Sequence, residues 1–201
     1  MARPSYSTEQ REEIEQRICD TAMALFAQHG YRSVSMRAIA AELGWSAPAL
    51  YRYYGNKDAL LGSIRAAGFA QLESLLAAVR AETDSGPEAV MAAMRAYVMF
   101  GMEHSELYRL MYELDQGEFT QPPEVGQARK RAFHQAELMA QDILDEAGQP
   151  GDANRMAHLM WIAAHGLIAL AVASQLDLGQ TLDELIEPVI GTVLTGIQHS
   201  E

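Results

Sequence analysis

Residues 51–57 bring three phenols and two cations together in one short stretch, reading Tyr-Arg-Tyr-Tyr-Gly-Asn-Lys. Phenol hydroxyls and cationic side chains donate hydrogen bonds to phosphate oxygens, and an arginine can also contact guanine O6 and N7 with both arms. The wider segment from Gly30 to Arg65 holds five Lys and Arg against two Asp and Glu, a net charge of +3. This segment alone is suited to facing a polyanion, although a solvated surface would carry the same charge.

The charge of the whole chain has the opposite sign. The 201 residues carry a formal net charge of −12, and the isoelectric point is near 4.9. Residues 1–65 have a net charge of +1, whereas residues 66–201 have 7 Lys and Arg against 20 Asp and Glu, a net charge of −13. An acidic protein normally binds nucleic acid poorly, because cations that neutralise phosphates supply most non-specific affinity. Here the asymmetry lets the acidic part be repelled while the basic part docks, which orients the encounter.

Three helices are predicted to position the Tyr and Arg cluster. Apolar residues recur at spacings of three and four from Ser7 to Gln28, with a Ser7 and Gln10 capping box at the start and Gly30 at the end. Ser35 can cap a second helix that Gly44 ends.

A third helix is predicted over Ala47–Tyr53, with Ser46 as its N-cap and Pro48 in its first turn. Only Gly44, Trp45 and Ser46 separate it from the second helix. Two short helices joined by such a turn form a helix-turn-helix, whose second helix enters the major groove of DNA.

The rest of the chain is predicted to be helical as well. No segment shows a convincing period-two alternation between turn signals, so we expect an all-α fold of about nine helices. Residues 115–123 read as a loop because they contain Gly117 and the pair Pro122-Pro123. The six further helices are expected from Asn56 to about Arg80, from Pro87 to Met102, from Ser105 to Leu114, from Glu124 to Ala147, from Asp152 to about Asp177 and from Leu182 to Ile197.

Composition and motifs exclude several classes of function. Cys19 is the only cysteine, so no intramolecular disulfide can form, which fits the cytoplasm. The first residues lack the apolar stretch of a secretory signal. The longest apolar stretch, Leu159–Ala173, is shorter than the roughly 20 residues of a membrane span, so we expect a buried helix and no membrane association. GxGxxG, Walker, GxSxG and HExxH motifs are absent from the sequence, so we expect no enzyme activity, cofactor or metal.

Residues 18–61 resemble the N-terminal domain of the TetR family of bacterial repressors. They read ICDTAMALFAQHGYRSVSMRAIAAELGWSAPALYRYYGNKDALL, and they keep the helix-closing Gly30, an I-A-x-x-x-G run over 39–44 and an L-Y-x-Y-F-x-S-K-E-x-L-like run over 50–60. Tyr54 stands where the family usually has Phe, Asn56 where it has Ser and Asp58 where it has Glu. Trp45, where a valine is frequent, could alter how the third helix is presented.

The resemblance implies which residues contact DNA. Tyr51, Tyr53 and Lys57 match positions that hold the DNA backbone, and Arg52 matches a position that faces base edges. Tyr54 is expected in the core because it takes the place of the Phe. Arg37 could reach a phosphate or a base edge, or it could be a solvated arginine. The full set of expected DNA-binding residues is Ser35, Arg37, Ser46, Ala47, Pro48, Ala49, Tyr51, Arg52, Tyr53 and Lys57.

Residues 91–161 are rich in methionine and aromatic residues. Eight of the 11 methionines lie there, and because Met is unbranched and adaptable, such surfaces suit an apolar cavity as well as ordinary core filling. Residues 104–112 and the pattern Trp161-x-x-x-His165-Gly166 resemble the WHG-type subclass of TetR C-terminal domains. The expected ligand-binding residues are Met94, Tyr97, Val98, Tyr108, Met111, Tyr112, Phe133, Trp161 and His165. For His165, a dimer contact and a satisfied core histidine are alternatives.

The last two predicted helices are suited to helix packing between two copies. Small residues around Gly166 let another helix approach closely, and a single helix-turn-helix reads few bases, so two linked copies bind better. The expected dimer-interface residues are Gly166, Ala169, Ala173, Val189, Ile190, Val193, Leu194 and Ile197.

The sequence therefore predicts two domains. Residues 1–56 form a helix-turn-helix DNA-binding domain, and residues 57–201 form a helical ligand-binding and dimerisation domain, joined to the first by a long fourth helix. The predicted function is a cytoplasmic homodimeric repressor that binds a palindromic double-stranded operator and is released by a small apolar effector. The alternative is a helix-turn-helix DNA-binding protein of the same fold without a small ligand, acting as a nucleoid or partner-binding factor, whose body should be well packed rather than hollow.

Overall fold

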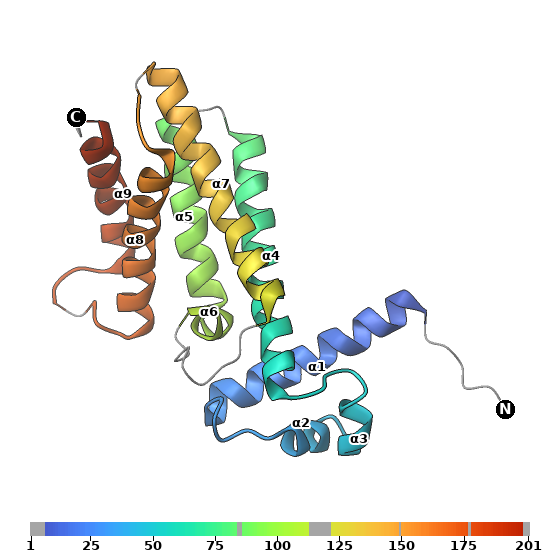
Figure 1. Ribbon diagram of the computed structural model, residues 1–201. Coiled ribbons are helices and arrows are strands. Elements are labelled where there is room, and N and C mark those ends of the chain that lie inside the picture. Colours follow the sequence, from blue (N-terminus) through green and yellow to red (C-terminus); the bar gives the residue numbers. More distant parts are fainter. Residues whose placement is uncertain (1–6, 84–85, 113–121, 149, 177, 199–201) are drawn as a thin grey trace.

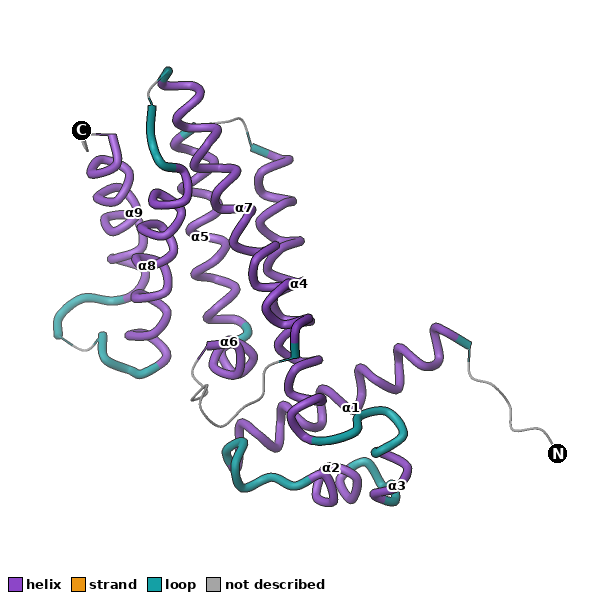
Figure 2. Tube along the Cα trace, in the orientation of Figure 1, coloured by secondary structure: helices purple, strands orange, loops and turns teal. Residues whose placement is uncertain are grey.

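The computed structural model describes residues 7–83, 86–112, 122–148, 150–176 and 178–198. Within these ranges the chain contains helices and turns and no strand (Figure 2). The helices are α1 Thr8–His29, α2 Met36–Glu42, α3 Ala47–Leu50, α4 Lys57–Glu82, α5 Pro87–Glu103, α6 Ser105–Tyr112, α7 Pro123–Ala147, α8 Ala153–Val172 and α9 Leu182–Gln198. The all-α prediction is confirmed, and the predicted loop over 115–123 falls mostly outside the described residues.

Helix ends follow the predicted capping chemistry. The Ser7 hydroxyl accepts from the Gln10 amide while the Gln10 side chain accepts from the Ser7 amide, which confirms the capping box of α1. Ser35 Oγ accepts from Ala38 N at 3.2 Å, and Asn56 Oδ1 accepts from Ala59 N at 2.7 Å. These caps satisfy amide groups that have no partner inside their helices, and they fix where α1, α2 and α4 begin.

Two helices are shorter than predicted. α3 ends at Leu50 rather than Tyr53, because the amides of Arg52 and Tyr53 bond to carbonyls three residues back and form turns. Ser46 occupies the N-cap position of α3 but makes no capping hydrogen bond with its side chain. α8 ends at Val172, about five residues before the predicted end, and Ser174 follows with a positive φ of 53°.

The molecule divides into a small head and a taller body (Figure 1). α1, α2 and α3 form the head around a core that includes Ile18, Phe26, Ile39 and Leu50, none more than 3% exposed. α4 starts in the head and runs up into the body, where it packs against α5, α6 and α7. One continuous helix therefore connects the two parts.

α5, α7, α8 and α9 complete the body. α8 lies between α5 and α7 on one side and α9 on the other. Gly68 and Gly101 allow close helix approach: a Cβ at Gly68 would lie 2.7 Å from Met111 Sδ, and one at Gly101 would lie 2.6 Å from Ile168 Cδ1. These glycines bring α4 onto α6 and α5 onto α8.

Candidate nucleic-acid interface and ligand cavity

The outer side of the head carries the side chains that were expected to meet DNA. Arg37, Arg52 and Tyr51 are exposed, with Tyr51 48% exposed. Tyr53 is half-buried against Trp45, their ring centroids 5.8 Å apart. Ser35, Ser46 and Pro48 are exposed as well, and Ala47 and Ala49 are half-buried. The sequence thus places exposed hydroxyls, two exposed arginines and small side chains on and next to α2 and α3. These two helices lie next to each other at the end of the head away from the body (Figure 1).

Tyr54 belongs to the core of the head, as predicted. It is 9% exposed, and its hydroxyl lies 3.4 Å from both Cys19 Sγ and Ser63 Oγ. Burial raises the pKa of the Tyr54 phenol above its ordinary range. The extra hydroxyl, compared with the usual Phe, is therefore accommodated by polar partners on α1 and α4.

Lys57 makes contacts within the protein that the sequence did not reveal. Its Nζ donates to the carbonyl oxygens of Tyr31 at 2.7 Å, Arg32 at 3.4 Å and Val34 at 2.8 Å, and it lies 4.2 Å from the centroid of the Tyr31 ring. The hydroxyl of Tyr31 donates to the carboxylate of Asp58. The first two residues of α4 thus hold the loop between α1 and α2.

This arrangement explains a cation at a helix start. The helix dipole disfavours a positive charge there, but three carbonyl dipoles surround the ammonium group of Lys57. Burial lowers the pKa of Lys57. Because an ammonium group has three protons and three carbonyls lie within reach, the expected phosphate contact of Lys57 competes with these bonds.

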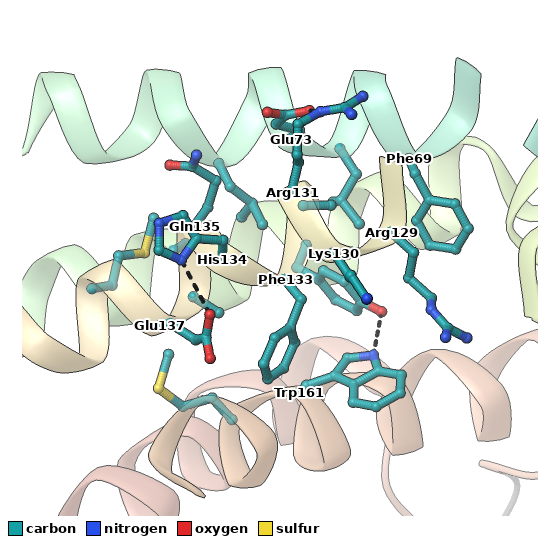
Figure 3. Close-up of a pocket in the computed structure, with 18 of the residues that line it drawn as sticks. Phe69, Glu73, Arg129, Lys130, Arg131, Phe133, His134, Gln135, Glu137 and Trp161 are labelled. Carbon is teal, nitrogen blue, oxygen red and sulfur yellow. Dashed lines mark hydrogen bonds and ion pairs between the residues drawn. The ribbon is translucent and has the colours of Figure 1, made fainter. Parts of the chain in front are cut away.

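A cavity of about 950 Å³ lies in the body between α4, α5, α7 and α8 (Figure 3). Its walls are mainly apolar. Phe69, Leu72 and Leu76 come from α4, Ala93 and Met94 from α5, Met139 from α7 and Met160 from α8. Volume and lining are those of a pocket for a small organic molecule.

The cavity contains five of the nine residues that were expected to bind a ligand. Met94, Tyr97, Tyr112, Phe133 and Trp161 line it. Val98 and Met111 are buried in the core, and Tyr108, whose hydroxyl contacts that of Tyr97, hydrogen-bonds to His165. The structure therefore favours a histidine that hydrogen-bonds within the core over a direct ligand contact of His165.

Two groups of cavity-lining residues were not predicted from the sequence: those on α4 and the polar residues at the rim. The rim residues are Glu73, Arg129, Lys130, Arg131, His134, Gln135, Glu137, Asn154 and His158. The leucines of α4 looked like ordinary core residues, and the basic run over 129–131 on the predicted seventh helix was the one visible signal of the rim.

Hydrogen bonds connect the aromatic residues at one side of the cavity. Trp161 Nε1 donates to Tyr97 Oη at 3.0 Å, and Tyr97 Oη donates to Tyr112 Oη at 3.2 Å. Tyr108 Oη lies 3.0 Å from Tyr97 Oη. Burial raises the pKa of both Tyr97 and Tyr112, so these phenols keep their protons.

α8 presents an exposed apolar face on the outside of the body. Leu159, Ile162 and Leu170 are 45%, 62% and 48% exposed, and they share this face with Gly166, Ala169 and Ala173 at helical spacing. By length and composition α8 could cross a membrane, and only 33% of an apolar stretch of 18 residues within it is buried. The expectation of a buried helix was therefore wrong for this face.

The expected dimer residues of α9 are not all on the surface. Ile190 and Leu194 are 0% and 7% exposed, because they pack in the core of the protomer. This corrects their assignment to an interface. Val189 and Val193 are half-buried, and the side chain of Ile197 lies outside the described residues.

Comparison with known proteins agrees with this geometry. Residues 18–64 match the model of the bacterial regulatory proteins of the tetR family, and residues 90–193 match the tetracyclin repressor-like C-terminal domain. The transcriptional repressor KstR of Rhodococcus jostii is 37% identical over 68 residues, which cover 34% of this chain and 32% of KstR. The matched segments thus span about a third or less of the curated relatives' length.

Solved structures extend the similarity to almost the whole chain. The putative regulatory protein SCO4313 superposes with a TM-score of 0.83 at 20% identity, covering 95% of this chain and all of that one. A protein of unknown function from Rhodococcus sp. RHA1 gives a TM-score of 0.79 at 27% identity, with 92% and 95% covered.

A head with a helix-turn-helix, joined by one long helix to a hollow helical body, defines a regulator of the DNA-binding type. The chain belongs to the TetR family of bacterial regulatory proteins.

Proposed function

We propose that this protein is a cytoplasmic transcriptional repressor that binds a palindromic operator as a homodimer and is released by a small, largely apolar effector. The observation that carries the proposal is the cavity of about 950 Å³, four of whose lining residues come from α4, the helix that also holds the head. The alternative without a ligand requires a well-packed body, which this cavity disfavours.

α4 is the proposed connection between effector and DNA. Phe69, Leu72 and Leu76 line the cavity, and Lys57 and Asp58 at the start of the same helix hold the loop before α2. A ligand that moves α4 therefore moves the helix-turn-helix. In a dimer the two recognition helices must lie roughly 34–36 Å apart to meet half-sites one turn apart, so a small displacement lowers affinity.

We propose that the two copies pack through the exposed face of α8. Removing this apolar face from water favours association, and Gly166 and the neighbouring alanines permit close approach of a partner helix. The same packing accounts for a long, apolar helix with one exposed face, without requiring a membrane.

The DNA-binding part is tested by sequencing genomic fragments that the purified protein selects. We expect one enriched motif with twofold symmetry. Tyr51→Phe and Tyr53→Phe should weaken binding to it, because each removes a hydroxyl from the outer side of the head. Arg52→Ala should relax base preference at one position of each half-site. Binding without preference for any duplex over random competitor at low salt would refute the proposal.

The effector part is tested by thermal melting across a library of small molecules. An effector should raise the melting temperature, because it binds only the folded protein, and should also release the selected DNA. If no compound of a broad library stabilises the protein, the alternative function without a small ligand is favoured.

A further inference from the structure

The rim of the cavity concentrates the positive charge of an acidic body. Residues 66–201 contain 7 Lys and Arg, and three of these are Arg129, Lys130 and Arg131, all of which line the cavity. The same segment has a net charge of −13. Nearly half of its cations are therefore placed at one opening, which an anionic ligand would meet first.

The acidic residues of the rim already have partners. Glu73 pairs with Arg131 at 3.0 Å, and Glu137 pairs with His134 at 3.1 Å and accepts from Asn154. Arg129 makes no ion pair or hydrogen bond with any residue that the structure describes. In Figure 3, Arg129 extends from α7 towards α8 on the side of Trp161, whereas Arg131 lies beside Glu73 on α4.

A relay of hydrogen-bond donors ends beside Arg129. The indole N–H of Trp161 can only donate, and it donates to Tyr97, which in turn donates to Tyr112. Tyr112 thus accepts a hydrogen bond and keeps its own proton, for which the described part of the chain shows no acceptor. Burial raises the pKa of Tyr112, and the nearby charge of Arg129 acts in the opposite direction.

The space next to these two donors is apolar. Phe69, Leu72 and Leu76 on α4 face Met94, Met139 and Met160 across it. The part of a ligand that fills this space must be a hydrocarbon. Beside Arg129 and Tyr112, the cavity instead offers two hydrogen-bond donors and a positive charge.

On the basis of the proposed function, we propose that the effector is an apolar carboxylic acid whose carboxylate is bound by the Arg129 guanidinium and the Tyr112 hydroxyl. A guanidinium and a carboxylate match in geometry and charge, and a phenol adds a further donor to the same anion. Arg129 is exposed on α7 and Tyr112 is half-buried, so a neutral ligand would leave the guanidinium to water and would gain no charge-assisted hydrogen bond from it. A cationic compound would be repelled by Arg129.

Melting curves with matched ligands test the charge of the head group. Dodecanoate, hexadecanoate and phenylbutanoate are each compared with the alcohol and the amine of the same carbon skeleton. We expect at least one carboxylate to raise the melting temperature and release the selected DNA, with its alcohol and amine weaker by about tenfold or more. If no carboxylate binds better than its alcohol, the proposal is overturned.

Variants then locate the anion. Arg129→Gln should weaken binding of the active carboxylate by about tenfold or more, Arg129→Lys should weaken it less, and Tyr112→Phe should weaken it severalfold. Arg155→Gln is the matched control, because Arg155 is exposed on α8 and does not line the cavity, and it should bind as the wild type does.

The Arg129→Gln and Tyr112→Phe variants should also bind the acid and its alcohol with more similar affinities than the wild type does. Loss of packing alone would weaken both ligands and leave this ratio unchanged. Equal discrimination in Arg129→Gln and the wild type overturns the assignment. Selection of genomic DNA needs no effector, so failure here is distinguishable from failure of the proposed DNA-binding function.

Discussion

At the scale of single residues, the first two side chains of α4 determine how the head is held. Lys57 donates to carbonyls of the loop over 31–34, and Asp58 accepts from the hydroxyl of Tyr31. A cation in a basic, phenol-rich stretch was interpreted from the sequence as a phosphate contact. The contacts across 23 to 26 residues that give it a second role depend on the fold.

Lys57→Met should destabilise the head. The variant keeps most of the aliphatic stem but removes the donor from the carbonyls of Tyr31 and Val34, which should cost about 1–2 kcal/mol for a half-buried, charge-assisted site. The measurement is chemical denaturation, with the exposed Arg37→Met as control. Unchanged stability together with a flatter salt dependence of DNA binding would instead place the ammonium group on phosphate.

Cys19 should react slowly in the folded protein. Burial raises the pKa of its thiol, and the thiolate is the reactive form, so alkylation needs either deprotonation against this shift or opening of the head. We expect alkylation by iodoacetamide at mildly alkaline pH to be at least about tenfold slower than in denaturant, as followed by mass spectrometry. Equal rates in both conditions would show that the folded head does not shield the thiol.

At the scale of elements, local chemistry made the helix starts predictable. Ser7, Ser35, Asn56 and Thr181 are followed by the residues that complete their caps, and each cap is present. The ends of α3 and α8 were less predictable, because apolar side chains continue past them while the backbone turns. The α4 wall of the cavity was not predictable at all, since a leucine stripe reads the same in a solid core and in a hollow one.

Gly101→Ala should weaken the packing of α5 on α8. A Cβ at this position would lie 2.6 Å and 2.8 Å from two carbons of Ile168, a side chain with no exposed surface. Because both partners are confined, overpacking should cost about 1–3 kcal/mol and lower the melting temperature. The matched control is Gly191→Ala in α9, where no atom lies within 4 Å of the added carbon.

The control should be neutral or slightly stabilising, because alanine is about 1 kcal/mol better than glycine inside a helix. If both variants melt at the wild-type temperature, the close approach of α5 and α8 is not maintained in solution. If both are destabilised, the added methyl group acts through something other than the Ile168 contact.

At the scale of the whole molecule, modest energies are sufficient for regulation. A tenfold loss of operator affinity needs about 1.4 kcal/mol of coupling between effector and DNA. α4 is part of both the cavity and the head, so the ligand needs only to prefer one position of this helix. The acidic body and the basic head fit the same division, because only the head is suited to approach DNA.

The exposed face of α8 makes the dimer testable by one charge. Ile162 is 62% exposed within a protomer, more than Leu159 or Leu170 on the same face. In a twofold interface the same patch of each copy meets the other, so Ile162→Glu buries two like charges close together. We expect the variant to be monomeric at micromolar concentration by light scattering, with native helix content. It should also bind the selected DNA much more weakly, because the half-sites are no longer bound by linked heads.

The control is Met99→Glu on α5, which should remain dimeric because Met99 is 40% exposed and lies outside this face. An Ile162→Glu protein that stays dimeric would place the dimer interface on another surface. The apolar face of α8 would then bind something other than a second copy of the chain.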